Sequence, residues 1–276
     1  MRLDQTLDSP AATFDGSKTT EVLAMAGSTA PKGRLVVIAR DGGEGPSHPI
    51  LDQLDIGRSE GDVIIADDRF LSPRHARIVR RAATVFVRDL WSVNGIYRRV
   101  KPGESGEQKL QDQDLILLGQ QVLRFEIVKE GEEGFGPAVQ HGTLVFGTPV
   151  GPQLCSLGGA RLVARSTDGV ARDVHHLRKA ETVLGREQGD VVFTDDPFLS
   201  RKHAVIRLRN PDGPNPTYTL GDIESSNGTF LRIRGEIEIQ HGDELRMGQQ
   251  LFRLDLSGKE LVAPKKVEVQ PAAEGS

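Results

Sequence analysis

Short runs of alternating apolar and polar residues recur along the chain, with turn-forming residues between them. Residues 123–127 are representative, because Leu123, Phe125 and Ile127 alternate with Arg124 and Glu126 and so share one face of an extended strand. Comparable runs predict strands at residues 34–39, 63–66, 76–79, 85–90, 115–118 and 122–128. The pattern contains no long amphipathic helix. Short strands separated by turns are typical of an all-β sandwich.

The second half of the chain repeats this pattern. Phe252, Leu254 and Leu256 alternate in the same way as residues 123–127, at an offset of 129 residues. A repeat of this length predicts two copies of one domain. We therefore expect a disordered arm at 1–32, a first domain at 33–128, a linker rich in Gly and Pro at 129–158, a second domain at 159–257 and a disordered tail at 258–276.

Three short motifs accompany the repeat. The second copy contains Gly185-Arg186, Ser200-x-x-His203 and Asn227-Gly228, and the first contains Gly57-Arg58, Ser72-x-x-His75 and Asn94-Gly95. The arginines, serines and histidines of the two copies are each 128 residues apart, and the asparagines 133. A guanidinium, a hydroxyl and a side-chain amide on loops between strands suit a phosphate and the backbone beside it.

Composition limits the classes of function. A net charge of −4 argues against a general nucleic-acid or acidic-membrane binder, and no apolar run approaches the length of about 18 residues that a membrane helix needs. Cys155 is the only cysteine and the N-terminus lacks a secretory signal, so we expect a cytoplasmic protein. No catalytic, cofactor or metal motif emerges, so we expect neither an enzyme nor a bound cofactor.

Both copies resemble the forkhead-associated (FHA) family of phosphothreonine-binding modules, on the strength of the three motifs in this order. The resemblance covers about 195 of the 276 residues. It implies two β-sandwiches with recognition loops at one end. It also implies a non-enzymatic adaptor whose partners are phosphothreonine-containing proteins, namely Ser/Thr kinases or their substrates. Recognition of phosphorylated segments is a known use of such a surface.

In the second copy, the resemblance assigns Arg186, Ser200 and Ser226 to the phosphate. It places Arg201 near the phosphate or the ligand backbone, and Asn227 at the peptide main chain. His203 is expected to brace the loop that presents the serine. Gly185 and Gly228 are expected to serve turn geometry.

The first copy departs from the family pattern. Arg58, Ser72 and Asn94 remain as phosphopeptide-binding candidates, with Arg74 partly restoring positive charge and with Gly57 and His75 as structural support. Pro73 and Val93, however, replace the counterparts of Arg201 and Ser226. We therefore expect the first site to bind phosphothreonine more weakly than the second, or to recognise something else.

Two alternatives and one internal ligand remain open. The first copy could be a scaffold that docks partners without phosphate. Nucleic acid is an unexpected partner, but could bind through a basic strip made of Arg74, Arg77, Arg80 and Arg81. In the arm, Thr19 and Thr20 are similar to a paired-threonine switch found ahead of some bacterial FHA regulators, so their phosphorylation would create an intramolecular ligand.

Overall fold

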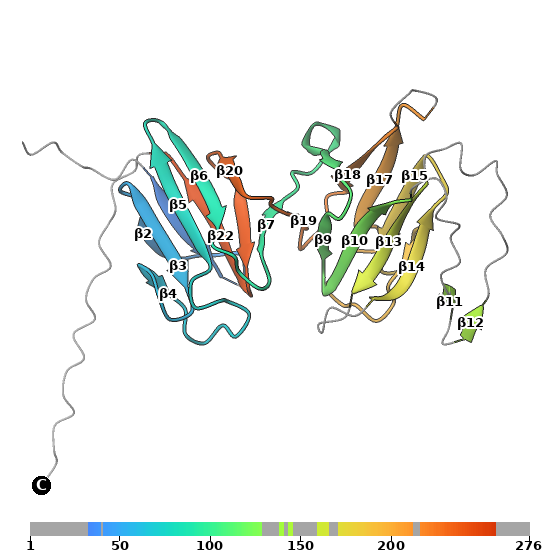
Figure 1. Cartoon of the computed structure of the whole chain (residues 1–276), viewed down its shortest axis with the longest axis horizontal. Coiled ribbons are helices and arrows are strands. Elements are labelled where there is room, and N and C mark those ends of the chain that lie inside the picture. The colour runs from blue at the N-terminus through green and yellow to red at the C-terminus, as the bar shows by residue number, and fades with distance from the viewer. Residues whose placement is uncertain are drawn as a thin grey trace, which may run out of the picture. The chain divides into compact units, whose positions relative to one another are not determined.

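Strands make up nearly all the regular structure of the protein. The computed structural model describes residues 33–39, 41–128, 138–140, 143–145, 159–165, 171–211 and 216–257 (Figure 1). Within these ranges the helical structure is one 3-10 turn, η1 (Glu104–Gly106), and no helix is long and apolar enough to cross a bilayer. The predicted all-β class is confirmed.

The first sequence repeat supplies ten strands, which have the following bounds. They are β1 (Arg34–Ile38), β2 (Glu44–Pro49), β3 (Gln53–Gly57), β4 (Val63–Ile64), β5 (Ala76–Arg81), β6 (Thr84–Asp89), β7 (Ile96–Arg99), β8 (Gln108–Leu110), β9 (Leu115–Leu118) and β10 (Gln121–Ile127).

The second repeat supplies the same series. Its strands are β13 (Ala160–Arg165), β14 (Ala171–Leu177), β15 (Glu181–Gly185), β16 (Val191–Val192), β17 (Ala204–Arg209), β18 (Thr217–Asp222), β19 (Thr229–Arg232), β20 (Glu236–Ile239), β21 (Glu244–Met247) and β22 (Gln250–Asp255). The expected linker contains the antiparallel pair β11 (Ala138–Gln140) and β12 (Thr143–Val145). The expected arm and tail lie outside the described residues.

The two repeats exchange strands. One sandwich, here called sandwich A, combines the described residues of 33–100 with 233–257: its five-stranded sheet runs β20-β6-β5-β3-β4, and its second layer runs β7-β21-β22-β1-β2. Sandwich B comprises the described residues of 101–232, with the layers β16-β15-β17-β18-β8 and β14-β13-β10-β9-β19. Each sandwich therefore contains the last three strands of the other repeat, β20–β22 in sandwich A and β8–β10 in sandwich B.

The two hydrophobic cores follow the same division. Phe252 and Leu245 of the second repeat are fully buried in one cluster with Ile56 and Ile78 of the first. In the other cluster Phe125 lies against Tyr218, with ring centroids 5.3 Å apart. Each large apolar side chain that is buried in this way contributes about 1.5–3 kcal/mol to stability. The expected domain ranges 33–128 and 159–257 therefore do not match the packed units.

The exchange is possible because the repeats carry interchangeable strands. β10 pairs with β13 and β22 pairs with β1, and both pairs are antiparallel. The chain passes between the sandwiches along β7 and β19, which pair with each other through Phe230↔Arg99, Leu231↔Arg98 and Arg232↔Tyr97. These paired crossover strands join the two outer layers into one ten-stranded sheet.

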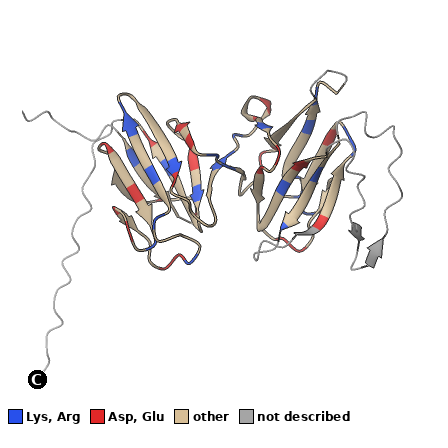
Figure 2. Ribbon diagram, viewed as in Figure 1, with Lys and Arg blue, Asp and Glu red and all other residues tan. Residues whose placement is uncertain are grey.

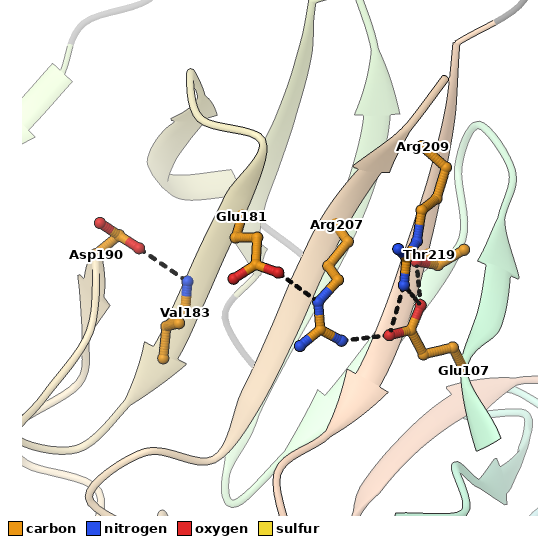
Figure 3. Close-up of polar contacts among 7 residues, drawn as sticks. All are labelled: Glu107, Glu181, Val183, Asp190, Arg207, Arg209 and Thr219. Atoms are coloured by element: carbon orange, nitrogen blue, oxygen red, sulfur yellow. Dashed lines mark hydrogen bonds and ion pairs between the residues drawn. The ribbon is translucent and has the colours of Figure 1, made fainter. Parts of the chain in front are cut away.

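A polar network fastens the exchanged strands in sandwich B. Glu107, just before β8, accepts hydrogen bonds from Arg207 and Arg209 on β17 and, at 2.6 Å, from Thr219 on β18 (Figure 3). Its side chain is only 7% exposed. Burial acts to raise the pKa of Glu107, but the hydrogen bonds from these three residues outweigh it and lower the pKa. The carboxylate of Glu107, from the first repeat, is thus bound to strands β17 and β18 of the second repeat.

Reciprocal carboxylates repeat this exchange at the turns. Asp196 of the second repeat accepts the backbone N–H of Gln120, at 2.7 Å, from the first. Asp68 of the first repeat accepts the backbone N–H of Gln249, at 2.7 Å, from the second. Each sandwich therefore contains the same turn contact, built from residues of both repeats.

Candidate functional site

In sandwich B the three sequence motifs meet at neighbouring loops. Arg186 follows β15, and its backbone N–H donates to the carbonyl of Ser200 at 3.0 Å. The loop that carries Ser200 passes so close to Gly185 that a Cβ on this glycine would lie 2.1 Å from the carbonyl oxygen of Arg201. Gly185 is required by this approach and not, as expected, by turn geometry. Gly228 does occupy a left-handed turn position, with φ 81°.

His203 connects two of these loops. Its Nδ1 accepts the backbone N–H of Ser200 at 3.1 Å, and its Nε2 donates to the carbonyl of Gly228 at 3.1 Å. Burial lowers the pKa of His203, although the carbonyl of Gly228 acts in the opposite direction. A neutral ring is what these contacts require, because only an unprotonated Nδ1 can accept.

The Asn-Gly loop is fixed to the serine loop by two further bonds. The backbone N–H of Ser226 donates to Oγ of Ser200 at 3.1 Å, and Nδ2 of Asn227 donates to the carbonyl of Phe198 at 2.8 Å. The Ser200 hydroxyl accepts in this bond, so its own proton remains available for a ligand. Among the described residues, nothing donates to the amide oxygen of Asn227.

Asp222 stabilises the Asn-Gly loop through hydrogen bonds to the residues on either side of it. Sequence reasoning did not identify this residue. Its carboxylate accepts the N–H of Ser225 at 2.9 Å and the hydroxyls of Ser225 and Thr229, both at 2.6 Å. Asp89 holds the corresponding loop of the first repeat through the N–H of Ser92 at 2.8 Å. The shared offset of 133 residues between Asp89 and Asp222 is the signal that could have found them.

Two arginines in sandwich B face one carboxylate. Glu187 Oε1 accepts from Arg186 Nε at 3.2 Å and Nη2 at 2.8 Å, while Oε2 lies 3.4 Å from Arg201 Nε. All three groups reach solvent, with side-chain exposures of 34% for Arg186, 72% for Arg201 and 48% for Glu187. The geometry therefore allows both guanidinium groups to approach a single anion. Sequence reasoning did not consider Glu187, which lies outside the three motifs.

We call this group site B: Arg186, Ser200, Arg201, Ser226 and Asn227. Site A, in sandwich A, consists of Arg58, Ser72, Arg74 and Asn94 and has the same backbone framework. His75 accepts from the N–H of Ser72 at 3.1 Å and donates to the carbonyl of Gly95 at 3.0 Å. Asn94 Nδ2 donates to the carbonyl of Phe70 at 2.8 Å, and the N–H of Arg58 donates to the carbonyl of Ser72 at 2.9 Å. Loop geometry therefore does not distinguish the sites.

The side chains at the surface do distinguish them. Val93, whose N–H donates to Ser72 Oγ at 3.0 Å, stands where site B has Ser226 and is 83% exposed. Trp91 stands where the second repeat has Glu224 and is 95% exposed. Pro73 stands where site B has Arg201. Among the described residues, no ion pair involves Arg58 or the exposed Arg74.

The basic strip beside site A is largely neutralised. Arg77 forms a two-pronged contact with Asp55, with both bonds at 2.7 Å. Arg80 pairs with Asp52 at 3.1 Å, and Arg81 pairs with Glu236. Figure 2 shows Lys and Arg interspersed with Asp and Glu over the strands. Thr19 and Thr20 of the expected internal ligand lie outside the described residues.

The fold is a pair of β-sandwiches, and in each one the Gly-Arg, Ser-x-x-His and Asn-Gly loops lie next to one another. This combination is that of a phosphopeptide-binding β-sandwich module. The FHA domain family matches residues 54–119 and 182–248. A curated relative from Corynebacterium diphtheriae, an oxoglutarate dehydrogenase inhibitor, is 33% identical over 135 residues, which cover 48% of this chain and 83% of that protein. The chain therefore belongs to the FHA-domain proteins.

Other relatives match shorter stretches. The glycogen accumulation regulator GarA of Mycobacterium tuberculosis is 34% identical over 95 residues, covering 33% of this chain and 51% of that protein. Among solved structures, one from a study of phosphothreonine-dependent FHA domain interactions is 26% identical. It covers 33% of this chain and 91% of its own, with a TM-score of 0.20.

Proposed function

We propose that the protein is a non-enzymatic adaptor that binds phosphothreonine-containing proteins in Ser/Thr kinase signalling, with site B as the stronger reader. The observation that carries this proposal is the shared contact of Arg186 and Arg201 with the Glu187 carboxylate, on loops that meet where the Arg186 N–H donates to the Ser200 carbonyl. A phosphate placed there would meet two permanently charged groups and the hydroxyls of Ser200 and Ser226.

The chemistry of these groups favours a phosphorylated ligand over a plain one. Arginine binds phosphate oxygens in a two-pronged geometry, and each hydrogen bond to a charged group contributes about 1.5–3 kcal/mol. A phosphate carries close to two negative charges, so it would displace the singly charged Glu187 from Arg186. Asn227 offers a free amide oxygen to the main chain of the bound peptide.

The relatives support a regulatory role. Two of them are an oxoglutarate dehydrogenase inhibitor and a glycogen accumulation regulator. We infer that this protein likewise acts by binding other proteins, including Ser/Thr kinases or their substrates. We place it in the cytoplasm, where its one cysteine would stay reduced.

In this proposal the N-terminal arm supplies an internal ligand. Phosphorylation of Thr19 or Thr20 would place a phosphothreonine on the same chain as site B, where a tethered ligand competes at high effective concentration. We expect kinase-treated protein to carry phosphate on one of these residues and to bind external peptides more weakly. Phosphorylation there without weaker peptide binding would refute this switch.

The central test uses the whole chain and a fluorescent phosphothreonine peptide library, with the same peptides unphosphorylated. Arg186→Ala should reduce capture by at least about tenfold, because it removes two or more charged hydrogen bonds. Arg58→Ala is the matched control and should leave most of the capture intact. Equal capture of phosphorylated and plain peptides, or unchanged capture by Arg186→Ala, would refute the proposal.

A phosphate-independent scaffold remains a second candidate for site A alone. Val93 and Trp91 favour it, because they present apolar groups where the second repeat presents Ser226 and Glu224. Nucleic-acid binding has no such support, since carboxylates pair with Arg77, Arg80 and Arg81.

A further inference from the structure

Trp91 is exposed in a way that neither folding nor packing explains. It is the only tryptophan of the chain, its side chain is 95% exposed, and its φ of 62° is uncommon for a bulky residue. The corresponding residue of the other repeat, Glu224, has a similar φ of 49° and needs no apolar contact. Residues held in such a conformation cluster at ligand-binding sites.

Trp91 borders a cavity of about 370 Å³ next to site A. The cavity is also lined by Arg88 of β6 and by Arg232 and Ile233 of the second repeat. Val93, two residues after Trp91, is 83% exposed, and its N–H donates to Oγ of Ser72 at site A. The loop from Trp91 to Val93 therefore connects the cavity with site A, and we call this surface the Trp91 patch: Arg88, Trp91, Val93, Arg232 and Ile233.

The charge of the patch is predominantly positive. Arg88 is exposed and forms no ion pair among the described residues. Arg232 lies 3.9 Å from Asp89, at the outer limit of an ion pair. Two guanidinium groups thus face the cavity against one carboxylate, so the patch suits an acidic ligand.

We propose that the Trp91 patch binds the residues flanking a phosphothreonine held at site A, and that it selects peptides with an apolar or aromatic side chain near a carboxylate. This proposal rests on the proposed function and adds the ligand class of the weaker site. Tryptophan and arginine are the residues that most often dominate protein binding surfaces. Site A lacks a guanidinium and a hydroxyl at Pro73 and Val93, and an apolar contact with Trp91 would compensate for the binding energy lost there.

A peptide ligand is compatible with the size of the patch. An extended peptide advances about 3.3 Å per residue, so a peptide held at site A would pass the loop from Trp91 to Val93 within a few residues of the phosphothreonine. A cavity of about 370 Å³ accommodates one side chain and its neighbours. Site A would therefore recognise the side chains that flank the phosphothreonine, whereas site B would recognise mainly the phosphate.

The single tryptophan provides a direct test in the whole protein. The probes are synthetic phosphothreonine peptides with Phe, Asp or Ala at each flanking position, added to protein carrying Arg186→Ala so that site B is disabled. Peptides with Phe and Asp should shift the Trp91 emission to shorter wavelength and protect it from iodide quenching. They should bind at least about tenfold more tightly than their alanine counterparts.

Two variants of Trp91, and the reverse substitution at Glu224, separate ligand contact from structural support. Trp91→Glu, which copies the other repeat, should remove the preference for Phe at least about tenfold. Trp91→Gly should do the same without lowering the melting temperature, because glycine suits the positive φ. Glu224→Trp, in protein carrying Arg58→Ala, should give site B a preference for Phe.

The failures are distinguishable. If the unmodified protein captures phosphopeptides but the Arg186→Ala protein captures none, the proposed function survives and the patch proposal falls. The patch proposal also falls if Trp91→Glu keeps the preference for Phe, or if only duplex DNA shifts the emission. If the unmodified protein captures no phosphopeptide, the proposed function fails and the patch proposal fails with it.

Discussion

Sites A and B share a framework and differ at their surfaces. In both, a buried histidine connects the serine loop to the Asn-Gly loop, and a side-chain amide bonds to a phenylalanine carbonyl. Site B adds Arg201 and Ser226, whereas site A presents Val93 and Trp91. The comparison teaches that the two sites share one loop framework, so the difference in ligand binding that we propose has to come from the side chains that differ at their surfaces.

The largest effect is expected from cutting the chain, because the comparison assumes that each site belongs to one sandwich. A fragment of residues 101–232 contains every described strand of sandwich B and should fold and bind phosphopeptide. A fragment of residues 159–257 keeps all of site B but lacks β8–β10 and the buried Phe125, so it can fold only by placing β20–β22 in their positions, and it should unfold at a lower temperature than the 101–232 fragment. Circular dichroism and thermal unfolding measure both. A 159–257 fragment at least as stable as the 101–232 fragment would contradict a preference for the exchanged strands.

Exchanging surface residues should reverse the difference between the sites. Pro73→Arg with Val93→Ser should raise the phosphothreonine affinity of site A by about tenfold or more, because it supplies a guanidinium and a hydroxyl. Ser226→Val should weaken site B in the same assay. Fluorescence anisotropy, with the other site disabled by Arg58→Ala or Arg186→Ala, measures each affinity. Unchanged affinities would show that these positions do not determine the ranking.

A smaller effect is expected from Glu187. Its ion pairs with Arg186 and Arg201 are exposed and so contribute only about 0–1 kcal/mol. Glu187→Ser, which copies Ser59 of the first repeat, should therefore tighten phosphopeptide binding at site B by at most about fivefold. Ser59→Glu should weaken site A by a similar factor. Weaker binding by Glu187→Ser would show that the carboxylate assists the arginines.

Acidification should change the difference between the two sites least, because both sites contain the same histidine contacts and should lose stability together. Burial lowers the pKa of His75 and His203 below the ordinary value of 6.5. The unfolded chain then binds protons more readily than the folded one, so the free energy of unfolding should fall as the pH drops below about 6.5. Urea unfolding of the ligand-free protein between pH 7.5 and 5.5 checks the sign. Greater stability at pH 5.5 would contradict it.

Sequence reasoning predicted the fold class and the grouping of the motif residues. The motifs lie between short strands, and a β-sandwich brings the loops at the ends of neighbouring strands together. It could not predict the strand exchange. Residues 123–127 and 252–256 present the same alternation, so each set can complete either sheet. Trp91 and Glu187 were missed for a different reason: exposed loop side chains carry no periodicity, and their neighbours become evident only in three dimensions.

The crossover strands also have a consequence for biosynthesis. The core of residues 33–100 includes Leu245, Phe252 and Leu254, which are translated after all of residues 101–232. Sandwich B can therefore be complete before the last three strands of sandwich A have been made. Because domains generally fold as units during synthesis, we expect the sandwich that is begun first to be completed second.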